Sequence, residues 1–218
     1  MAVNESEDLM FAVSQFNVYR SADQGETWIP IGEGLPVDVV TSIAVDQSNN
    51  YLYVATSGNA VYRSSDNGDT WLEMSLGIAV SYVISLGVNP VNGHVFAATF
   101  SGIYYSENSG ESWVLRNEGF TANYAAEFAF TSTGRIFTGT FNGGIFYSDS
   151  DSIHWQSATD SIAIVAIPSV AVEPATDNIF AGTNGDGVYM STDNGETWEQ
   201  VLGANEKSPV QEDMIVDF

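Results

Sequence analysis

Carboxylates are the most abundant chemically active groups in this sequence. Its 218 residues include 28 Asp and Glu, against five Lys and Arg, two His and no Cys. Two carboxyl groups held roughly 5–10 Å apart can hydrolyse a glycosidic bond, one as acid and the other as base or nucleophile. Because 28 acids produce such a pair by chance alone, their presence does not by itself predict a hydrolase.

Other chemistries have less support. The absence of Cys excludes disulfides, thiol catalysis and Cys-ligated zinc. His94 and His154 are sixty residues apart and show no metal-ligand spacing. No stretch resembles a calcium-binding EF-hand loop, and no glycine-rich phosphate loop leads from a strand into a helix. We therefore expect no metal site and no cofactor.

The charge of the chain bears on its partners. A formal net charge of −23 repels phosphate backbones and anionic lipid headgroups, so nucleic acid is not an expected partner. No apolar run is long enough to span a bilayer, which predicts no membrane insertion. Residues 1–8 lack a basic region and an apolar core, so we expect no signal peptide within this chain.

A tryptophan repeat organises the whole sequence. The five Trp are spaced by 43, 42, 42 and 43 residues, and each follows a serine by seven positions. The pairs are Ser21 and Trp28, Ser64 and Trp71, Ser106 and Trp113, Ser148 and Trp155, and Ser191 and Trp198. Repetition with this period indicates one supersecondary unit copied five times.

A turn lies between each serine and its tryptophan. Three copies read Ser-x-Asp-x-Gly-x-Thr-Trp, with Asp23, Gly25 and Thr27; Asp66, Gly68 and Thr70; and Asp193, Gly195 and Thr197. The aspartate is expected to cap backbone N–H groups, and the glycine to supply the positive φ of a tight reversal.

Two copies of the turn are altered. The third carries Asn108, Gly110 and Ser112, and an amide oxygen can still cap the turn. The fourth keeps only its serine and tryptophan, with Ser150, Ser152 and His154 in place of Asp, Gly and Thr. Because a serine caps weakly, the fourth hairpin is predicted to be the loosest.

Short segments rich in β-branched and aromatic residues predict four strands in each repeat, the fourth beginning at the tryptophan, and no window has a helical period. The expected fold is all-β, a β-propeller of about five four-stranded antiparallel blades. A single domain would cover residues 1–218, with blade units at 1–36, 37–79, 80–122, 123–164 and 165–208 and an extra innermost strand at 209–218. The first strand carries one small residue at a fixed place, as innermost strands crowded around an axis require: Ala44, Gly87, Ala129 and Ala171.

The motif Ser-x-Asp-x-Gly-x-Thr-Trp resembles the Asp-box, or bacterial neuraminidase repeat. That repeat occurs in sialidases, xyloglucan-degrading hydrolases, photosystem II assembly factors, sortilin-type receptors and many secreted bacterial proteins. The resemblance implies a propeller whose Asp-box turns are structural and lie on the face away from the ligand site. It implies fold more strongly than function. The sequence of the repeat is similar to those of secreted bacterial surface proteins, so we expect an extracellular or cell-surface location within a longer precursor.

Two interpretations of the chain ends stay open. In one, the C-terminal strand completes the first blade and closes a five-bladed ring. In the other, residues 2–4 are already the innermost strand of the first blade, and the chain is a piece of a larger propeller.

Catalysis finds little support in the basic residues and the loops. The likeness to sialidases implies a clamp of three arginines, but Arg20 and Arg63 stand at equivalent repeat positions and are expected to be structural. Only Arg116 and Arg135 then remain. The connections on the expected ligand face are also short for a catalytic pocket. We therefore expect a non-catalytic binding or structural module. One alternative is a fragment of a glycoside hydrolase completed by other blades. A second is a protein-binding propeller like the photosystem assembly factors. The scarcity of basic residues argues against this second alternative.

The expected ligand face carries aromatic and amide side chains in the turns between second and third strands. Aromatic rings beside amides can stack on sugars or accept a peptide, so the expected partner is a protein or a glycan. An alternative is that the phenylalanines pack between neighbouring blades. The candidate residues are Phe16, Asn17, Asn59, Phe100, Phe141, Asn142, Asn184 and Asp186.

Overall fold

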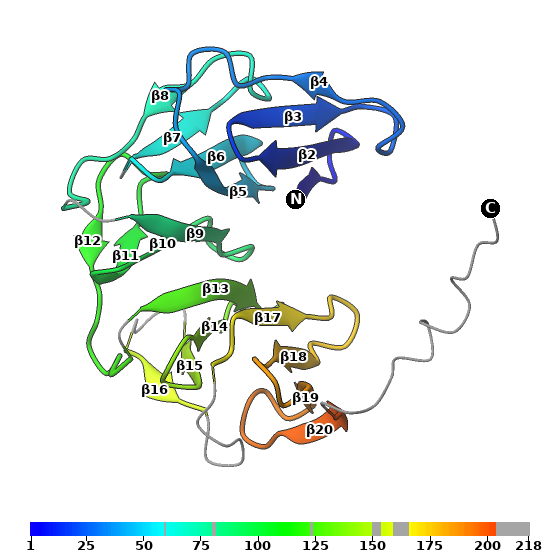
Figure 1. Ribbon diagram of the computed structural model, residues 1–218, viewed down its shortest axis with the longest axis vertical. Coiled ribbons are helices and arrows are strands. Elements are labelled where there is room, and N and C mark those ends of the chain that lie inside the picture. The colour runs from blue at the N-terminus through cyan, green and yellow to red at the C-terminus, as the bar shows by residue number, and fades with distance from the viewer. Residues whose placement is uncertain (59, 80–81, 123, 150–153, 159–165, 204–218) are drawn as a thin grey trace.

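The computed structural model describes residues 1–58, 60–79, 82–122, 124–149, 154–158 and 166–203. These residues form 20 strands and no helix. The strands make five four-stranded antiparallel sheets that follow one another along an arc, with one edge of each sheet toward a common axis (Figure 1). The predicted all-β propeller architecture is confirmed.

Each sheet takes four consecutive strands, which run outward from the axis in sequence order. The first two sheets consist of β1 (Ala2–Asn4), β2 (Leu9–Ser14), β3 (Asn17–Ser21) and β4 (Ile29–Pro30), and of β5 (Val40–Asp46), β6 (Tyr51–Thr56), β7 (Val61–Ser64) and β8 (Leu72–Glu73). The third consists of β9 (Val83–Val88), β10 (Val95–Thr99), β11 (Gly102–Ser106) and β12 (Val114–Leu115). The last two consist of β13 (Ala125–Phe130), β14 (Ile136–Thr140), β15 (Ile145–Ser148) and β16 (Gln156–Ser157), and of β17 (Ser169–Val172), β18 (Ile179–Gly182), β19 (Val188–Ser191) and β20 (Glu199–Leu202).

The innermost strand of the first sheet is β1, which pairs with β2 through Ala2 and Phe11. The predicted strand at 209–218 lies outside the described residues. The first and fifth sheets form the two ends of the arc (Figure 1).

Tryptophan side chains join each sheet to the one before it. Trp113 lies in one apolar cluster with Ala44, Tyr53 and Val61 of the second sheet, and Trp155 and Trp198 occupy corresponding clusters farther along. These three rings are at most 7% exposed. An indole of this size buries about 150–250 Å² and is a major source of packing energy.

A hydrogen bond to the preceding sheet fixes the position of three of the joining rings. The Nε1 of Trp71, Trp113 and Trp155 donates to the carbonyl of Ile31, Met74 and Arg116, at 2.8, 2.7 and 3.0 Å. Each acceptor is the third residue after the tryptophan of the preceding sheet. At the end of the arc, Trp28 donates instead to Gly25 in its own turn, at 3.0 Å.

The outermost strands begin one residue later than the sequence predicts. The expectation was that each begins at its tryptophan, but β12 and β16 begin after Trp113 and Trp155. The backbone N–H of these two residues donates to the carbonyls of Leu76 and Glu118, in the connections that leave the preceding sheets. The backbone N–H of each tryptophan therefore forms a hydrogen bond between sheets rather than within one sheet.

The small residue of the first strand is required by the neighbouring sheet. A Cβ on Gly87 would lie 2.7 Å from the ring of Phe130 and 3.0 Å from the Cβ of Phe128, in β13. The innermost strands of adjacent sheets approach so closely that the space for a larger side chain is already filled.

The Asp-box turns have the geometry that their residues predict. The Oδ1 of Asp23 accepts from the backbone N–H of Thr27 and from the hydroxyl of Ser21, at 2.8 and 2.7 Å. The Ser21 hydroxyl in turn accepts from the N–H of Gly25, at 2.9 Å, and Gly25 has a φ of 91°. Asn108 caps the third turn in the same way, accepting from the N–H of Ser112 at 3.0 Å. Residues 150–153 of the fourth turn lie outside the described residues.

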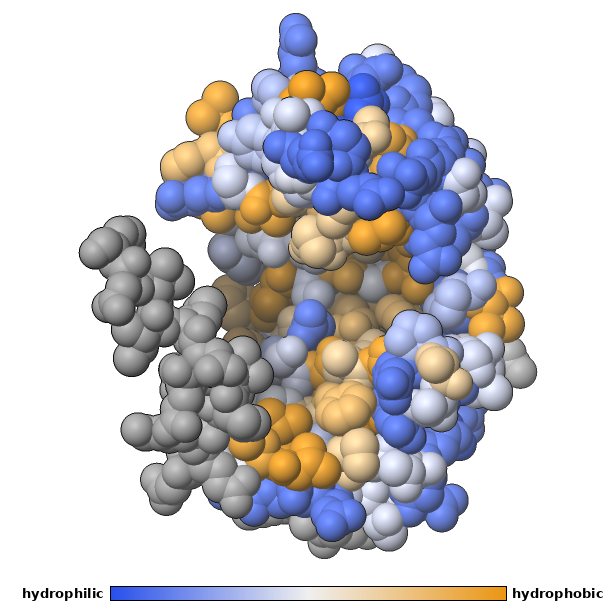
Figure 2. Space-filling view, turned by 90° about the vertical axis from the view of Figure 1, so that its right-hand side faces the viewer, coloured by the Kyte–Doolittle hydropathy of each residue, from blue (hydrophilic) through white to orange (hydrophobic). Residues whose placement is uncertain are grey.

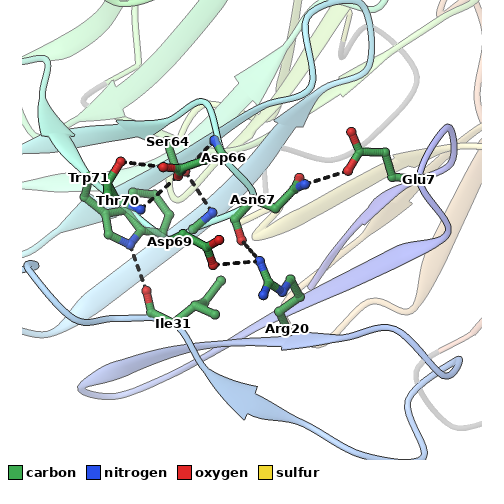
Figure 3. Close-up of polar contacts among 10 residues, drawn as sticks. Glu7, Arg20, Ile31, Ser64, Asp66, Asn67, Asp69, Thr70 and Trp71 are labelled. Carbon is green, nitrogen blue, oxygen red and sulfur yellow. Dashed lines mark hydrogen bonds and ion pairs between the residues drawn. The ribbon is translucent and has the colours of Figure 1, made fainter.

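Arginines connect the Asp-box turns of adjacent sheets (Figure 3). The guanidinium of Arg20 donates to the carbonyl of Asn67, at 2.8 Å, and forms an ion pair with Asp69, at 3.1 Å. Arg63 donates to the carbonyl of Ser109 at 2.7 Å. These contacts give both arginines the structural role that their repeat positions predict.

Removing an indole from the middle of the arc should cost more than removing one from its end. We expect Trp113→Ala to lower the free energy of unfolding by about 3–5 kcal/mol, because the ring is buried and bonded to the preceding sheet. Trp28→Ala is the matched control, and it should cost less than half as much, because that ring is partly exposed and bonds only within its own turn. Urea unfolding measures both, and equal losses would contradict this account of the sheet contacts.

The Asp-box carboxylates should add an acid-sensitive part to the stability. Hydrogen bonds from Thr27 and Ser21 lower the pKa of Asp23 from 3.8 to about 2, and the pKa of Asp193 is lowered to about 2 by the same contacts in its turn. Because these pKa values are lower in the folded chain, the stabilisation is complete above about pH 4 and is lost as the pH falls toward 2. The double variant Asp23→Asn, Asp193→Asn should therefore lose less of its urea midpoint between pH 4.5 and 2.5 than the parent chain. An unchanged acid dependence would contradict this assignment.

Candidate functional site

The sheets divide the turns between two faces. In an antiparallel sheet of four strands, the first and third turns lie at one end, and the second turn lies at the other with the connection to the next sheet. The Asp-box turns are third turns and therefore share one face. The predicted ligand residues lie in second turns, on the opposite face.

Four aromatic side chains form a continuous row on this opposite face. The ring centroids of Tyr82 and Phe100 are 5.3 Å apart, those of Phe100 and Tyr124 are 5.2 Å apart, and those of Tyr124 and Phe141 are 5.3 Å apart. The tyrosines precede β9 and β13, and the phenylalanines follow β10 and β14. This row, called the aromatic ladder below, therefore crosses from the third sheet to the fourth.

The ladder lies at the surface. Phe100 is 56% exposed and Phe141 is 44% exposed, whereas Tyr82 and Tyr124 are partly buried. Phe100 does touch Tyr124 of the next sheet, but its exposure keeps it outside the inter-sheet core. Phe16 is 59% exposed and makes no ring contact with any residue that the structure describes, so the ladder does not include it.

Several predicted polar residues have structural contacts. The Oδ1 of Asn17 accepts from the N–H of Val18 at 2.8 Å, and a Cβ on Gly32 would collide with it. Asp186 accepts from the Tyr189 hydroxyl at 2.6 Å, a bond that raises the pKa of this tyrosine. These contacts tie Asn17 and Asp186 to the ends of their own sheets.

The other predicted amides differ in their positions. Asn142 is exposed in the turn that follows Phe141, next to the ladder. Asn184 is exposed in the fifth sheet, and its backbone N–H donates to the carbonyl of Ala166 at 2.9 Å. Asn59 lies outside the described residues. The structure thus brings Phe100, Phe141 and Asn142 together and leaves Phe16, Asn17, Asn184 and Asp186 in other sheets.

Tyr82 and Tyr124 were not among the predicted residues. A signal for them exists, because they stand 42 residues apart, at the same place before the first strand of two successive repeats. The prediction considered only turns within a sheet, whereas these tyrosines lie where the connections between sheets end.

The charged groups on this face are held by neighbours. Asp38 accepts from the Ser57 hydroxyl and from the N–H of Val39, and the Ser57 bond is the main reason why its pKa is lowered. Glu127 borders a hollow of about 370 Å³ at the axis and accepts from the Ser169 hydroxyl at 2.8 Å. Figure 2 looks toward the arc from its open side and shows apolar side chains lining the hollow behind the opening.

The described residues contain no group of three His, Asp or Glu able to hold a metal ion. They also contain no helix of the length and apolarity that would cross a bilayer. Arg135 forms an ion pair with Asp149 at 2.8 Å and donates to the carbonyl of Asn194 at 3.1 Å. This arginine therefore connects the fourth sheet to the fifth Asp-box turn, as Arg20 and Arg63 connect earlier ones.

Sequence comparison identifies the family. The model of the Sortilin-Vps10 family, described as sortilin, neurotensin receptor 3, matches residues 16–142, which is more than half of the chain. The chain belongs to the Sortilin-Vps10 family. The BNR/Asp-box repeat matches this Sortilin-Vps10 chain at residues 189–200, the fifth turn. No curated protein matches the sequence.

Solved structures show the same fold for the Sortilin-Vps10 chain. The GH74 xyloglucanase from Xanthomonas campestris superposes with a TM-score of 0.74 at 17% identity, over 92% of this chain and 38% of that enzyme. The chain thus spans less than two fifths of the xyloglucanase. YCF48 bound to a D1 peptide gives 0.69 at 16% identity, over 93% and 67%, and a nidogen/laminin complex gives 0.71 at 10% identity, over 91% and 77%. Identities this low establish a common fold and no common activity.

Trimming the exposed rings should leave the fold intact. We expect Phe100→Ala and Phe141→Ala each to lower the free energy of unfolding by about 1 kcal/mol or less, because about half of each ring is in water. Phe96→Ala and Phe137→Ala are the matched controls. Both rings are fully buried, so each control should cost about 3–5 kcal/mol. Thermal and urea unfolding would measure all four, and a loss for Phe100→Ala equal to that for Phe96→Ala would show that the ladder is core.

Proposed function

We propose that this chain is a non-catalytic binding module of a secreted or cell-surface bacterial protein, with its ligand on the face opposite the Asp-box turns. The observation that carries the proposal is the aromatic ladder. Contiguous apolar surface that stays in water mostly marks a contact site, and aromatic rings supply large contact areas at a low entropic cost. The ladder combines both properties on the face that the structural turns leave free.

A binding role also agrees with the hydrogen bonds that the carboxylates accept from protein groups. On the ladder face, Asp38, Glu127 and Asp186 each accept a hydrogen bond from a hydroxyl group of their own or a neighbouring sheet. Asp46 is the one fully buried acid among the described residues, and it accepts from Ser48 and Asn49 in its own turn. A general acid or nucleophile needs a group directed at the substrate, whereas these carboxylates are directed at protein donors.

The main alternative is a glycoside hydrolase fragment. The fold likeness to the GH74 xyloglucanase favours it, because the matched part is less than two fifths of that enzyme, and carboxylates on other blades would complete the site. A protein-binding propeller like the photosystem assembly factors is a second alternative. The fold likeness to YCF48 bound to a D1 peptide favours it, and the ladder face would then hold a peptide.

Ligand titration with NMR detection tests the proposal. A panel of soluble oligosaccharides and synthetic peptides is titrated into the labelled chain, and we expect any binder to perturb the resonances of Phe100 and Phe141. The double variant with Phe100→Ala and Phe141→Ala should weaken that binding at least tenfold, since it removes two of the four rings. Phe16→Ala removes an exposed ring outside the ladder and should not change the affinity.

Two results would overturn the proposal. The first is binding that maps to another face or survives the double substitution. The second is turnover of chromogenic glycosides that disappears when a single carboxylate is replaced.

A further inference from the structure

We infer that the aromatic ladder binds an uncharged glycan chain that runs across the third and fourth sheets. The inference rests on the proposed function and names its ligand class. Three features support it: the row of rings, the lack of charged residues in the segments that carry them, and the hydrogen bonds of nearby backbone groups.

The shape of the ladder suits a chain of sugar rings. Successive centroids are 5.2–5.3 Å apart along the row, and no ring lies flat on the next, since the interplanar angles are 31°, 80° and 48°. The apolar C–H face of a pyranose packs on an aromatic ring, and its edges hydrogen-bond to hydroxyls and amides. Thr121 provides such a group and is exposed in one of the segments that carry the rings.

The segments that carry the ladder contain no charge. The segments that carry it, residues 82–85, 99–102, 120–125 and 140–144, contain no charged residue, although the chain has 33. The long-range field of a protein with a net charge of −23 disfavours acidic sugars. A basic peptide would find no carboxylate within these segments to pair with. A neutral ligand fits both conditions.

Three backbone groups in the turns that carry the ladder are already hydrogen-bonded. In the third sheet, the N–H of Ser101 donates to Thr99 Oγ1 at 3.1 Å, and the carbonyl of Ser101 accepts from Asn117 at 3.0 Å. In the fourth, the N–H of Gly143 donates to Thr140 Oγ1 at 2.8 Å. A peptide that binds by adding a strand needs unpaired backbone groups. Contact through the side-chain rings, as in sugar stacking, does not.

The site is specific to two of the five repeats. The positions equivalent to the ladder residues are occupied by Val39 and Ser57 in the second sheet and by Ala166 and Asn184 in the fifth. The four aromatic residues therefore occur at positions where the repeats differ. Such positions are not needed for the common framework, so they are where a ligand site is expected.

The experiment uses the full chain and three neutral hexasaccharides, a β-1,4-glucan, a β-1,3-glucan and a β-1,4-mannan. Affinities are measured by calorimetry, and the contacted sugar protons by saturation-transfer NMR. We expect at least one hexasaccharide to bind through its C–H faces. Tyr124→Ala, and likewise the double variant with Phe100→Ala and Phe141→Ala, should bind it at least tenfold more weakly. Phe100→Tyr should retain binding. A hexagalacturonate should bind at least tenfold more weakly than the best neutral chain.

A proline-rich peptide, decaproline, separates this inference from the proposed function. If decaproline binds at the ladder and no neutral hexasaccharide does, the glycan inference is wrong and a binding face remains. Equal affinity for the hexagalacturonate, or affinity unchanged by the double variant, also overturns the inference. If no probe touches the ladder, both the inference and the proposed function fail.

Discussion

The contact between a tryptophan ring and the sheet that precedes it determines the arrangement of this molecule. The indole packs on an apolar surface, its Nε1 donates to the carbonyl three residues after the previous tryptophan, and its backbone N–H bonds to the connection between the sheets. Three restraints on one residue fix the distance and the angle between neighbouring sheets. They thereby place the ring of Tyr124, carried by the fourth sheet, within 5.2 Å of Phe100 on the third.

The two faces of the arc have different tasks as a result. On the Asp-box face, side chains bond to turns: Asp23 closes its own hairpin, and Arg20 and Arg63 connect one hairpin to the next. With Arg135, which contacts the fifth turn, these bonds use three of the five basic residues of the chain. The opposite face carries no Asp-box turns, so the side chains of its connections can differ from one repeat to the next. The aromatic ladder occurs there, in the third and fourth sheets only.

Much of the fold could be predicted because one residue pattern encodes it repeatedly. The serine–tryptophan spacing gave the number of sheets, and the amide of Asn108 caps its turn as its chemistry suggested. The small residue at Gly87 also indicated crowded inner strands. The site was harder, since Tyr82 and Phe100 meet only through the pairing of β9 and β10, and Phe100 and Tyr124 only through the angle between two sheets. That angle is a property of packing and is not contained in any local pattern. For the same reason, exposed turn residues such as Phe16 and Asn184 were grouped with the ladder although the fold separates them.

Hydrogen exchange of the five indole N–H groups tests the central claim most directly, because four of the rings lie at the joints of the arc and the fifth, Trp28, lies at its end. In a ¹⁵N-labelled sample, the indole protons of Trp113 and Trp155 should exchange most slowly, since both rings are buried and bonded to the preceding sheet. Trp28 should exchange much faster, because its partly exposed ring bonds within its own turn. Equal exchange rates for all five, or rapid exchange at Trp113 and Trp155, would show that the rings do not hold the sheets together.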